Sequence, residues 1–534
     1  MELILINGKI VTLDSCERIA QAIGINEGKI AVIGNNDEVL SKRNTNTKVI
    51  NLKNKLVLPG FIDSHIHMLN YGYTSIQLTL GDCKSINDLV EVSQKYILDN
   101  EIKRGRWVLG RGWNQDYFIE KRFPTKDDLD KISSKHPICL TRACGHMAVA
   151  NSIAVDIAKS RFNKSINKEN IDWDLGIFKE DAINILYEAV TVPTIEEIKN
   201  IIEAAANDLL KSGITSVQSD DLTAIPDRDF EKVIKAYKEL MNEGRLPIRV
   251  YEQCLLSNKD ILNKFLSLGY KTGVGNEKFK VGPLKLLIDG SLGARTALLS
   301  DSYNDDPSTK GVPLYSQDEL NELVLAAHKN DMQVAVHAIG DKAMHMALDS
   351  INYAKCEFSR QEPRHGIIHC QITDEKILNR FKNEEVLAYI QPIFMDYDLH
   401  IVEDRIGKEK AKKTYNWKSM IDKGIRVSGG SDAPVVGFNV LENIYSAVTR
   451  MDLKKYPENG WLPNQKLTVD EAVRIFTING AYASFEENIK GTLEIGKLAD
   501  MVVLSEDIFI IEKERIKDVN VVMTIIDGKI AYEA

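Results

Sequence analysis

Short apolar runs alternate with amphipathic helical stretches through the middle of the chain. Strands that alternate with helices favour parallel pairing, because each helix carries the chain back to the start of the next strand. The pattern predicts eight such strands, at residues 58–65, 214–218, 248–253, 284–288, 333–337, 366–369, 386–391 and 425–428. Eight units of this kind are typical of a closed (β/α)8 barrel of the TIM type, so we assign the chain to the α/β class.

The segment before the second predicted strand shows how its helix is marked. Thr194 and Glu197 have the spacing of a capping box, which satisfies two backbone N–H groups at a helix start. Apolar residues then recur on one helical face, and Gly213 ends the helix. Thr468 and Glu471 repeat the capping signal, so a further helix is predicted after the last strand.

The two ends of the chain carry hairpin signals instead. Asn7-Gly8 lies between β-rich runs near the start, and Asp527-Gly528 has the same setting near the end. Such pairs are strong indicators of a β-hairpin. Two independent hairpins would be marginally stable. The pattern therefore favours one small sheet shared by residues 1–56 and 485–534, with the barrel over residues 57–484.

One segment interrupts the alternation. About 145 residues separate the first predicted strand from the second, far more than a strand-to-helix connection needs. The segment contains its own strand-like runs, WVLGRGW and ICLTRA. We predict a subdomain at residues 72–195, inserted after the first barrel strand, where it would act as a lid and contribute to substrate binding.

Composition narrows the range of functions. The chain has 534 residues and a formal net charge of −9, with 44% hydrophobic and 27% charged residues. These values exclude a disordered or collagen-like chain. The acidic balance argues against a nucleic-acid partner, because such binding depends on a positive field. We expect a small-molecule substrate, and the oligomeric state stays open, with a homodimer as one option.

The sequence also bears on location. No window reaches the roughly 18 consecutive apolar residues of a membrane span, so no membrane partner is expected. The N-terminus shows neither the basic nor the long apolar stretch of a signal peptide. Seven cysteines are scattered without CxxC pairs, which argues against a disulfide framework. A cytoplasmic protein is the resulting expectation.

The sharpest chemical motif is PGFIDSHIH, residues 59–67. Residues two apart on a strand point to the same face, so His65 and His67 direct two imidazoles to one point. One divalent metal ion requires this arrangement. Two unrelated surface histidines are the alternative, but the chain has only 10 histidines and this pair lies at a predicted strand end.

Further polar residues lie at the ends of later strands. VAVHAIGD contains His337, IIHCQ contains His369, and SGGSDAP places Asp432 after the last strand. Imidazole and carboxylate groups bind divalent ions, and a carboxylate also serves as a base. Lys285 lies in an apolar run, where a strand lysine would ordinarily point outward. Four histidines and an aspartate at nearby strand ends favour a Lys285 that points into the barrel. A lysine that has reacted with CO2 becomes a carbamate, which can bridge two cations.

This set resembles the metal site of the amidohydrolase superfamily of metal-dependent hydrolases. PGFIDSHIH and GTLEIGKLADMVVL are similar to its N- and C-terminal signatures, while KLLIDGSLGARTA, HAIGDKA and GWNQD resemble the branch of N-substituted formamide deformylases. The resemblance implies that His65 and His67 bind the more buried metal and that His337 and His369 bind the second. It also implies that Lys285 is the bridging carbamate and that Asp432 is a ligand and the general base. The family further implies that the sheet shared by the two chain ends, residues 1–56 and 485–534, is part of a small β-sandwich.

The resemblance implies cleavage of a carbon–nitrogen bond in an amide, formamide or cyclic amide, an EC 3.5 type of activity outside peptide bonds. Metal-bound hydroxide would attack, with Asp432 as the base. We expect two zinc ions, although manganese, iron or cobalt also suit these ligands. A mononuclear deaminase of the same superfamily is the alternative, and Lys285 argues against it. A non-catalytic scaffold is less favoured, because all six ligand positions are filled.

Three residues are predicted to contact the substrate. Trp113 supplies an aromatic surface in the inserted segment, and His146 follows a strand-like run there. Arg295, just past the fourth strand, can pair with a substrate carboxylate. The alternative is that the insert is only a packing layer and that His146 has a structural role.

Overall fold

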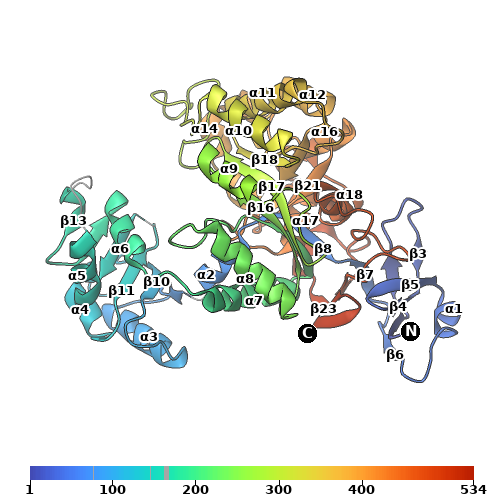
Figure 1. Cartoon of the computed structure of the whole chain (residues 1–534), viewed down its shortest axis with the longest axis horizontal. Helices are drawn as coiled ribbons and strands as arrows, with labels where there is room; N and C mark the ends of the chain where they lie inside the picture. Colours follow the sequence, from blue (N-terminus) through green and yellow to red (C-terminus); the bar gives the residue numbers. More distant parts are fainter. Residues whose placement is uncertain (76, 145, 162–167) are drawn as a thin grey trace. The chain divides into compact units, whose positions relative to one another are not determined.

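Eight parallel strands form one sheet, in the order β21-β20-β19-β18-β17-β16-β15-β8. Figure 1 labels β8, β16, β17, β18 and β21 of this sheet. Their bounds are β8 (Phe61–Ile66), β15 (Ile214–Ser219), β16 (Arg249–Leu255), β17 (Phe279–Leu287), β18 (Val334–Ala338), β19 (Gly366–His369), β20 (Leu387–Ile390) and β21 (Val427–Gly429). The backbone N–H of Asp432 donates to the carbonyl of His65 at 2.8 Å, which joins the chain after β21 to β8. This nearly closed parallel sheet agrees with the predicted TIM-type barrel.

The computed structural model describes residues 1–75, 77–144, 146–161 and 168–534. The chain forms two compact units. Residues 1–71, 202–222 and 234–534 make up the first, here called the barrel unit. Residues 72–201 and 223–233 make up the second, the insert unit. The boundaries proposed from the sequence stay predictions. Among the described residues, no helix combines the length and the apolar character needed to cross a bilayer.

The first predicted strand, residues 58–65, is divided between two strands. β7 (Leu56–Pro59) pairs in another sheet, and β8 begins only at Phe61. Gly60 lies between them, and a Cβ at this position would be 2.3 Å from the Thr215 side chain. A glycine therefore leaves room for the Thr215 side chain at the point where the chain enters the barrel. The other seven predicted strands overlap the observed ones, and residues 366–369 coincide with β19.

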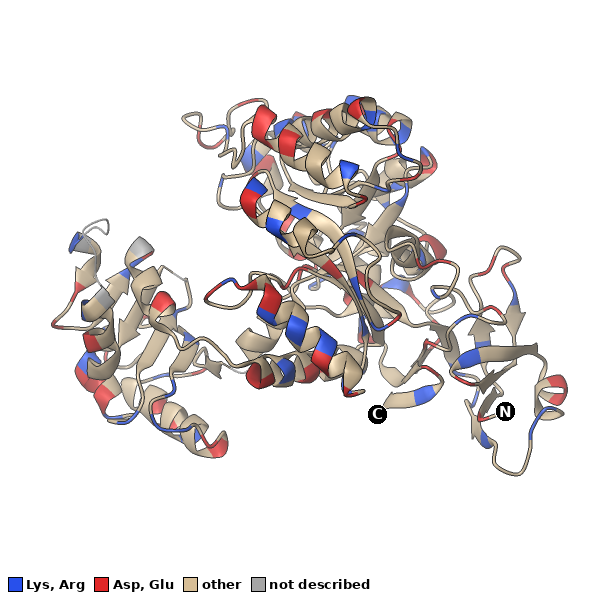
Figure 2. Cartoon of the chain, in the orientation of Figure 1, with Lys and Arg blue, Asp and Glu red and all other residues tan. Residues whose placement is uncertain are grey.

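Helices connect the barrel strands. Their bounds are α7 (Ile195–Lys211), α8 (Phe230–Asn242), α9 (Lys259–Ser267), α10 (Gln317–Lys329), α11 (Asp341–Glu357), α12 (Glu375–Asn383), α13 (Met395–Asp398), α14 (Val402–Ile406), α15 (Lys408–Ala411), α16 (Trp417–Asp422), α17 (Val440–Thr449), α18 (Val469–Ile475) and α19 (Ile478–Ala483). The two predicted capping boxes are confirmed at the starts of α7 and α18. Figure 2 shows acidic and basic positions interspersed along α7 and α8.

The ends of the chain form two further sheets. One has the order β5-β4-β1-β6, with β1 (Leu3–Ile6), β4 (Ala22–Asn26), β5 (Lys29–Gly34) and β6 (Lys48–Asn51). The other has the order β24-β23-β22-β7-β2-β3, with β2 (Lys9–Val11), β3 (Ile19–Ala20), β22 (Met501–Leu504), β23 (Val521–Ile526) and β24 (Lys529–Glu533). β7 and β22 pair antiparallel, so strands from both ends share this sheet. Leu3, Ile25, Val57, Met501 and Ile525 belong to one buried core that the two sheets share.

A buried ion pair ties the barrel to the C-terminal strands. Arg249, at the start of β16, donates to both carboxylate oxygens of Asp500 at 2.6 and 2.9 Å, and it also pairs with Asp527. Arg249 and Asp500 are almost completely buried. Removing one partner of such a pair leaves an uncompensated charge in a medium of low dielectric constant.

We expect Arg249→Ala to lower the free energy of unfolding by about 3–5 kcal/mol. Denaturant titration followed by fluorescence measures the change. Arg515→Ala is the control, because Arg515 and Glu506 form an exposed pair, and such pairs contribute at most about 1 kcal/mol. Equal losses in the two variants would contradict a stabilising role for the Arg249 contacts.

The insert unit has a sheet of its own, in the order β13-β14-β12-β11-β10-β9. Its elements are β9 (Leu78–Thr79), β10 (Val108–Trp113), β11 (Ile138–Arg142), β12 (Met147–Ala150), β13 (Ile171–Asp172), β14 (Ile177–Lys179), α3 (Ile86–Asp99), α4 (Lys126–Asp130), α5 (Ser152–Arg161) and α6 (Ile183–Ala189). The two strand-like runs noted in the sequence are β10 and β11, which pair in parallel.

Candidate metal centre

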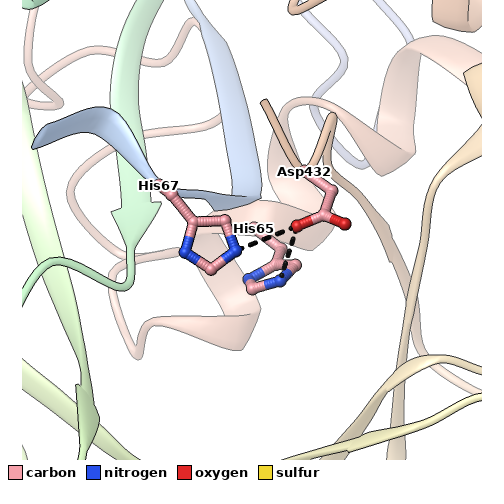
Figure 3. A group of neighbouring side chains, drawn as sticks. All are labelled: His65, His67 and Asp432. Atoms are coloured by element: carbon pink, nitrogen blue, oxygen red, sulfur yellow. Dashed lines mark hydrogen bonds and ion pairs between the residues drawn. The ribbon is translucent and has the colours of Figure 1, made fainter. Parts of the chain in front are cut away.

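His65, His67 and Asp432 meet at the carboxyl end of β8 (Figure 3). Oδ1 of Asp432 lies 3.2 Å from Nε2 of His65 and 3.1 Å from Nε2 of His67. A tetrahedral zinc ion with ligand bonds of about 2.0–2.1 Å holds its donor atoms about 3.3 Å apart. The three donor atoms therefore have the chemistry and the spacing of ligands to one divalent ion.

The other three predicted ligands lie beside this group. Nζ of Lys285, on β17, is 3.2 Å from Nε2 of His65, and Lys285 is buried instead of pointing out to solvent. The ring of His369 is centred 5.6 Å from that of His65 and 4.4 Å from that of His337. All six residues are thus neighbours at the carboxyl ends of barrel strands, the end at which such barrels carry their active sites.

Each of the four histidines has one ring nitrogen engaged by a protein oxygen. The pairs are His65 Nδ1 with the Gln253 amide oxygen (2.7 Å), His67 Nδ1 with the Asp220 carbonyl (3.2 Å), His369 Nδ1 with the Gln391 amide oxygen (2.8 Å) and His337 Nε2 with the Gly290 carbonyl (3.1 Å). An oxygen of this kind accepts a hydrogen bond, so the proton lies on the engaged nitrogen. In the neutral imidazole the opposite nitrogen then carries the lone pair, as in metal-binding histidines.

Burial sets the charge of three of these groups. Burial, together with the positive charge of Lys285, lowers the pKa of His65 to about 3 and that of His337 to about 4. Burial also lowers the pKa of Lys285 to about 8, although Asp220 and Asp432 oppose the shift. The two imidazoles are therefore neutral at pH 7, which is the form that binds a metal ion.

His67 and Asp432 favour a cation between them. Burial alone would lower the pKa of His67, but the hydrogen bond to Asp432 and the charge of Asp220 raise it to about 9. Burial acts to raise the pKa of Asp432, and its contacts with the imidazoles of His65 and His67 reverse this and hold it well below its usual value. A proton on His67, or a divalent ion between His67 and Asp432, would balance the negative charge of Asp432. The donor set therefore fits a metal ion.

Two of the proposed ligands have an unusual backbone conformation. His369 has φ = 81° and Asp432 has φ = 62°, both in the left-handed region. Residues other than glycine adopt this region at a cost, and such strain clusters at functional sites. Gly430 brings the chain after β21 close to β8, since a Cβ there would be 2.5 Å from the backbone nitrogen of His65. The fold thus sustains strain to direct these side chains into the barrel.

The predicted substrate-binding residues have other local contacts. Trp113 is completely buried in the core of the insert unit, and its indole N–H donates to the Leu140 carbonyl at 2.8 Å. Arg295 forms a two-pronged ion pair with Asp305. These contacts give Trp113 a packing role and engage the guanidinium of Arg295, so the predicted substrate contacts of both residues stay predictions.

His146 lies on the surface of the insert unit. Its side chain is 71% exposed, and Nδ1 lies 2.9 Å from Oε2 of Glu180. The predicted role in substrate binding stays a prediction.

Several residues that support the site were not predicted from the sequence. Gln253 and Asp220 orient His65 and His67, and Oδ1 of Asp63 accepts backbone N–H groups of His65 (3.1 Å) and Ser431 (3.0 Å). All three are buried polar residues within or just after barrel strands. A search for polar residues in otherwise apolar barrel strands would have found them.

Comparisons with known proteins agree with the geometry. A family model described as "Amidohydrolase family" matches residues 48–532. The chain is 30% identical to Protein LONG AFTER FAR-RED 3 of Arabidopsis thaliana, over 99% of this chain and 91% of that protein. It is 26% identical to N-substituted formamide deformylase of Arthrobacter pascens, over 100% of this chain and 98% of that protein. A crystal structure of an uncharacterized metal-dependent hydrolase from Pyrococcus furiosus has 31% identity and a TM-score of 0.81, covering 95% of this chain and 99% of that one.

Proposed function

The chain belongs to the amidohydrolase family and is a metal-dependent hydrolase of that superfamily, and we propose that it hydrolyses a carbon–nitrogen bond in an amide, a formamide or a cyclic amide. The observation that carries the proposal is the convergence of His65, His67, Lys285 and Asp432 at one end of the barrel. The relative named N-substituted formamide deformylase supports formamides as one substrate class.

The donor set suits two ions. We assign His65 and His67 to the more buried ion and His337 and His369 to the other, with Asp432 as a further ligand. Zinc is the first choice, and manganese, iron or cobalt also suit imidazole and carboxylate ligands. The neutral amine of Lys285 would bond to the carbon of CO2 and release a proton, and the resulting carbamate would bridge the ions.

Different groups of the site would have different roles in the hydrolysis. Bound divalent ions would lower the pKa of water and polarise the substrate carbonyl. Asp432 accepts a proton as the water oxygen bonds to the carbonyl carbon, and it returns that proton to the nitrogen as the carbon–nitrogen bond breaks. Gln253 and Gln391 hold the imidazoles of His65 and His369 in the tautomer that leaves Nε2 available.

Metal analysis combined with a substrate panel tests the proposal. Protein purified without chelators is expected to contain two divalent ions per chain. It should hydrolyse at least one member of a panel of N-substituted formamides, linear amides and cyclic amides. Chelation is expected to abolish this activity, and added zinc to restore it. One ion with release of ammonia from an amino-heterocycle would favour the deaminase, and protein without bound metal would contradict both.

We expect His146→Ala to lower kcat/KM while metal content and thermal stability stay near the wild-type values. His146 is exposed and pairs only with Glu180 among the contacts described, and exposed pairs contribute at most about 1 kcal/mol. Steady-state kinetics, metal analysis and thermal melts measure the three quantities. Glu180→Gln is the control, because it removes the same ion pair and keeps the imidazole. Parallel losses of stability and activity in His146→Ala would favour a structural role.

A further inference from the structure

Asp289 is a buried carboxylate that lies two residues after the end of β17. Its Oδ2 accepts the backbone N–H groups of Leu298 and Gly340, both at 2.8 Å, and its Oδ1 accepts that of Ile339 at 3.1 Å. Both oxygens therefore act as acceptors, and they join the loop after β17 to the loop after β18.

The same carboxylate faces the ring of His337. Its Oδ1 lies 3.4 Å from Nε2 of His337, the nitrogen that also lies 3.1 Å from the Gly290 carbonyl. Two acceptors thus converge on one ring nitrogen and favour the tautomer with the proton at Nε2. His337 differs in this respect from His65, His67 and His369, whose Nδ1 atoms are the engaged ones. Its lone pair must lie on Nδ1.

We propose that Asp289 is a positioning residue that fixes the tautomer and orientation of His337, so that Nδ1 is available to a divalent ion. The inference rests on the proposed function, because it takes His337 as a metal ligand. A carboxylate that orients a ligating imidazole through its other nitrogen is an established physical arrangement. The competing explanation is that Asp289 only ties the two loops together.

An asparagine at this position separates the two explanations. Its amide oxygen can accept from Leu298 and Gly340 as Oδ2 does, but its NH2 group then faces the Ile339 N–H and Nε2 of His337. Two donors facing each other repel, which opposes the proton at Nε2 that the Gly290 carbonyl still favours. The share of His337 with its proton at Nδ1, where it blocks metal binding, therefore rises. The variant would keep the contacts to Leu298 and Gly340 and lose the one to Ile339, whereas His337 would bind the metal ion more weakly.

The test compares zinc affinity in Asp289→Asn and the wild type. Both proteins are dialysed against buffers of fixed free zinc, and bound zinc per chain is measured. Changes to a partner of this kind cost about 10- to 100-fold in metal affinity. We therefore expect one of the two ions to dissociate at about 10- to 100-fold higher free zinc in the variant. Thermal stability of the metal-free proteins is measured in parallel.

Asp341→Asn is the matched control. Oδ1 of Asp341 accepts the Ser300 N–H at 3.0 Å, and Oδ2 pairs with Lys410, so this carboxylate also secures the loop after β17. Among the contacts described, Asp341 touches none of the proposed ligands. We expect it to lower stability and leave zinc affinity unchanged. His337→Ala is expected to lose the same ion, and adding Asp289→Asn to it should cause no further loss, because Asp289 acts through His337.

Three results would overturn the inference. They are wild-type zinc affinity in Asp289→Asn, an equal loss of affinity in Asp341→Asn, and additive losses in the double variant. If Asp289→Asn does not fold, Asp289→Ser replaces it, since a serine hydroxyl is too short to reach His337. Unchanged affinity in that folded variant also rejects the inference. Wild-type protein that binds no zinc would reject the proposed function itself, which separates the two failures.

Discussion

Asp432→Asn is expected to lower kcat by at least about 100-fold, the lower range for loss of a general base. The amide has nearly the shape of the carboxylate but cannot accept the proton that the attacking water releases. Asparagine tolerates the left-handed backbone that Asp432 adopts (φ = 62°), so the fold is expected to persist. Steady-state kinetics on the substrate found in the panel, with zinc in excess, measures the effect.

The experiment also needs a measurement of bound zinc and a matched control variant. Because Asp432 is also a proposed ligand, bound zinc is measured in every sample. Asp398→Asn is the control, since Asp398 is buried and accepts from Tyr415 and Gln371 without contacting the proposed ligands among the bonds described. We expect it to retain turnover close to wild type. Near-normal turnover in Asp432→Asn with zinc retained would remove Asp432 from the proton transfer.

Much of the barrel, and the grouping of the proposed ligands at one end of it, could be predicted because both follow from local periodicity. Alternation along one strand places His65 and its neighbour two residues on toward a single point. His369 marks the end of a short apolar run, and that run coincides with β19. The parallel arrangement then brings such strand ends together. The sequence therefore predicted the fold class, and the proposed ligands were found as neighbours.

The partners of those ligands depend on tertiary contacts. The residue that holds His65 lies 188 positions away on β16, and the one that holds His67 lies 153 positions away after β15. No local pattern connects such pairs, because only strand register in the closed sheet brings them together. The position of an aromatic residue also depends on tertiary contacts. The sequence predicts a substrate contact for Trp113, which stays a prediction, and it does not show that Trp113 packs in the core of the insert unit, because that packing depends on tertiary contacts.

Lys285→Ala is expected to lose zinc and activity together, because it removes the group that would bridge both ions. A lysine amine is a weak ligand beside His65, whereas its carbamate would supply two anionic oxygens. Added acetate or propionate is therefore expected to restore part of the zinc content and part of the activity, since a small carboxylate can occupy the space left by the side chain. Zinc analysis and kinetics with and without the acid measure both effects.

Lys490→Ala is the matched control for this rescue. Lys490 is also a buried lysine, but it pairs with Glu486 at 2.7 Å and donates to the Ser216 hydroxyl at 3.0 Å. Removing it is expected to lower stability, because Glu486 then loses a buried partner. Neither zinc content nor activity should respond to the acid in that variant. Full zinc occupancy in Lys285→Ala without any acid would contradict a bridging role, because the ions would then be held by the histidines and Asp432 alone.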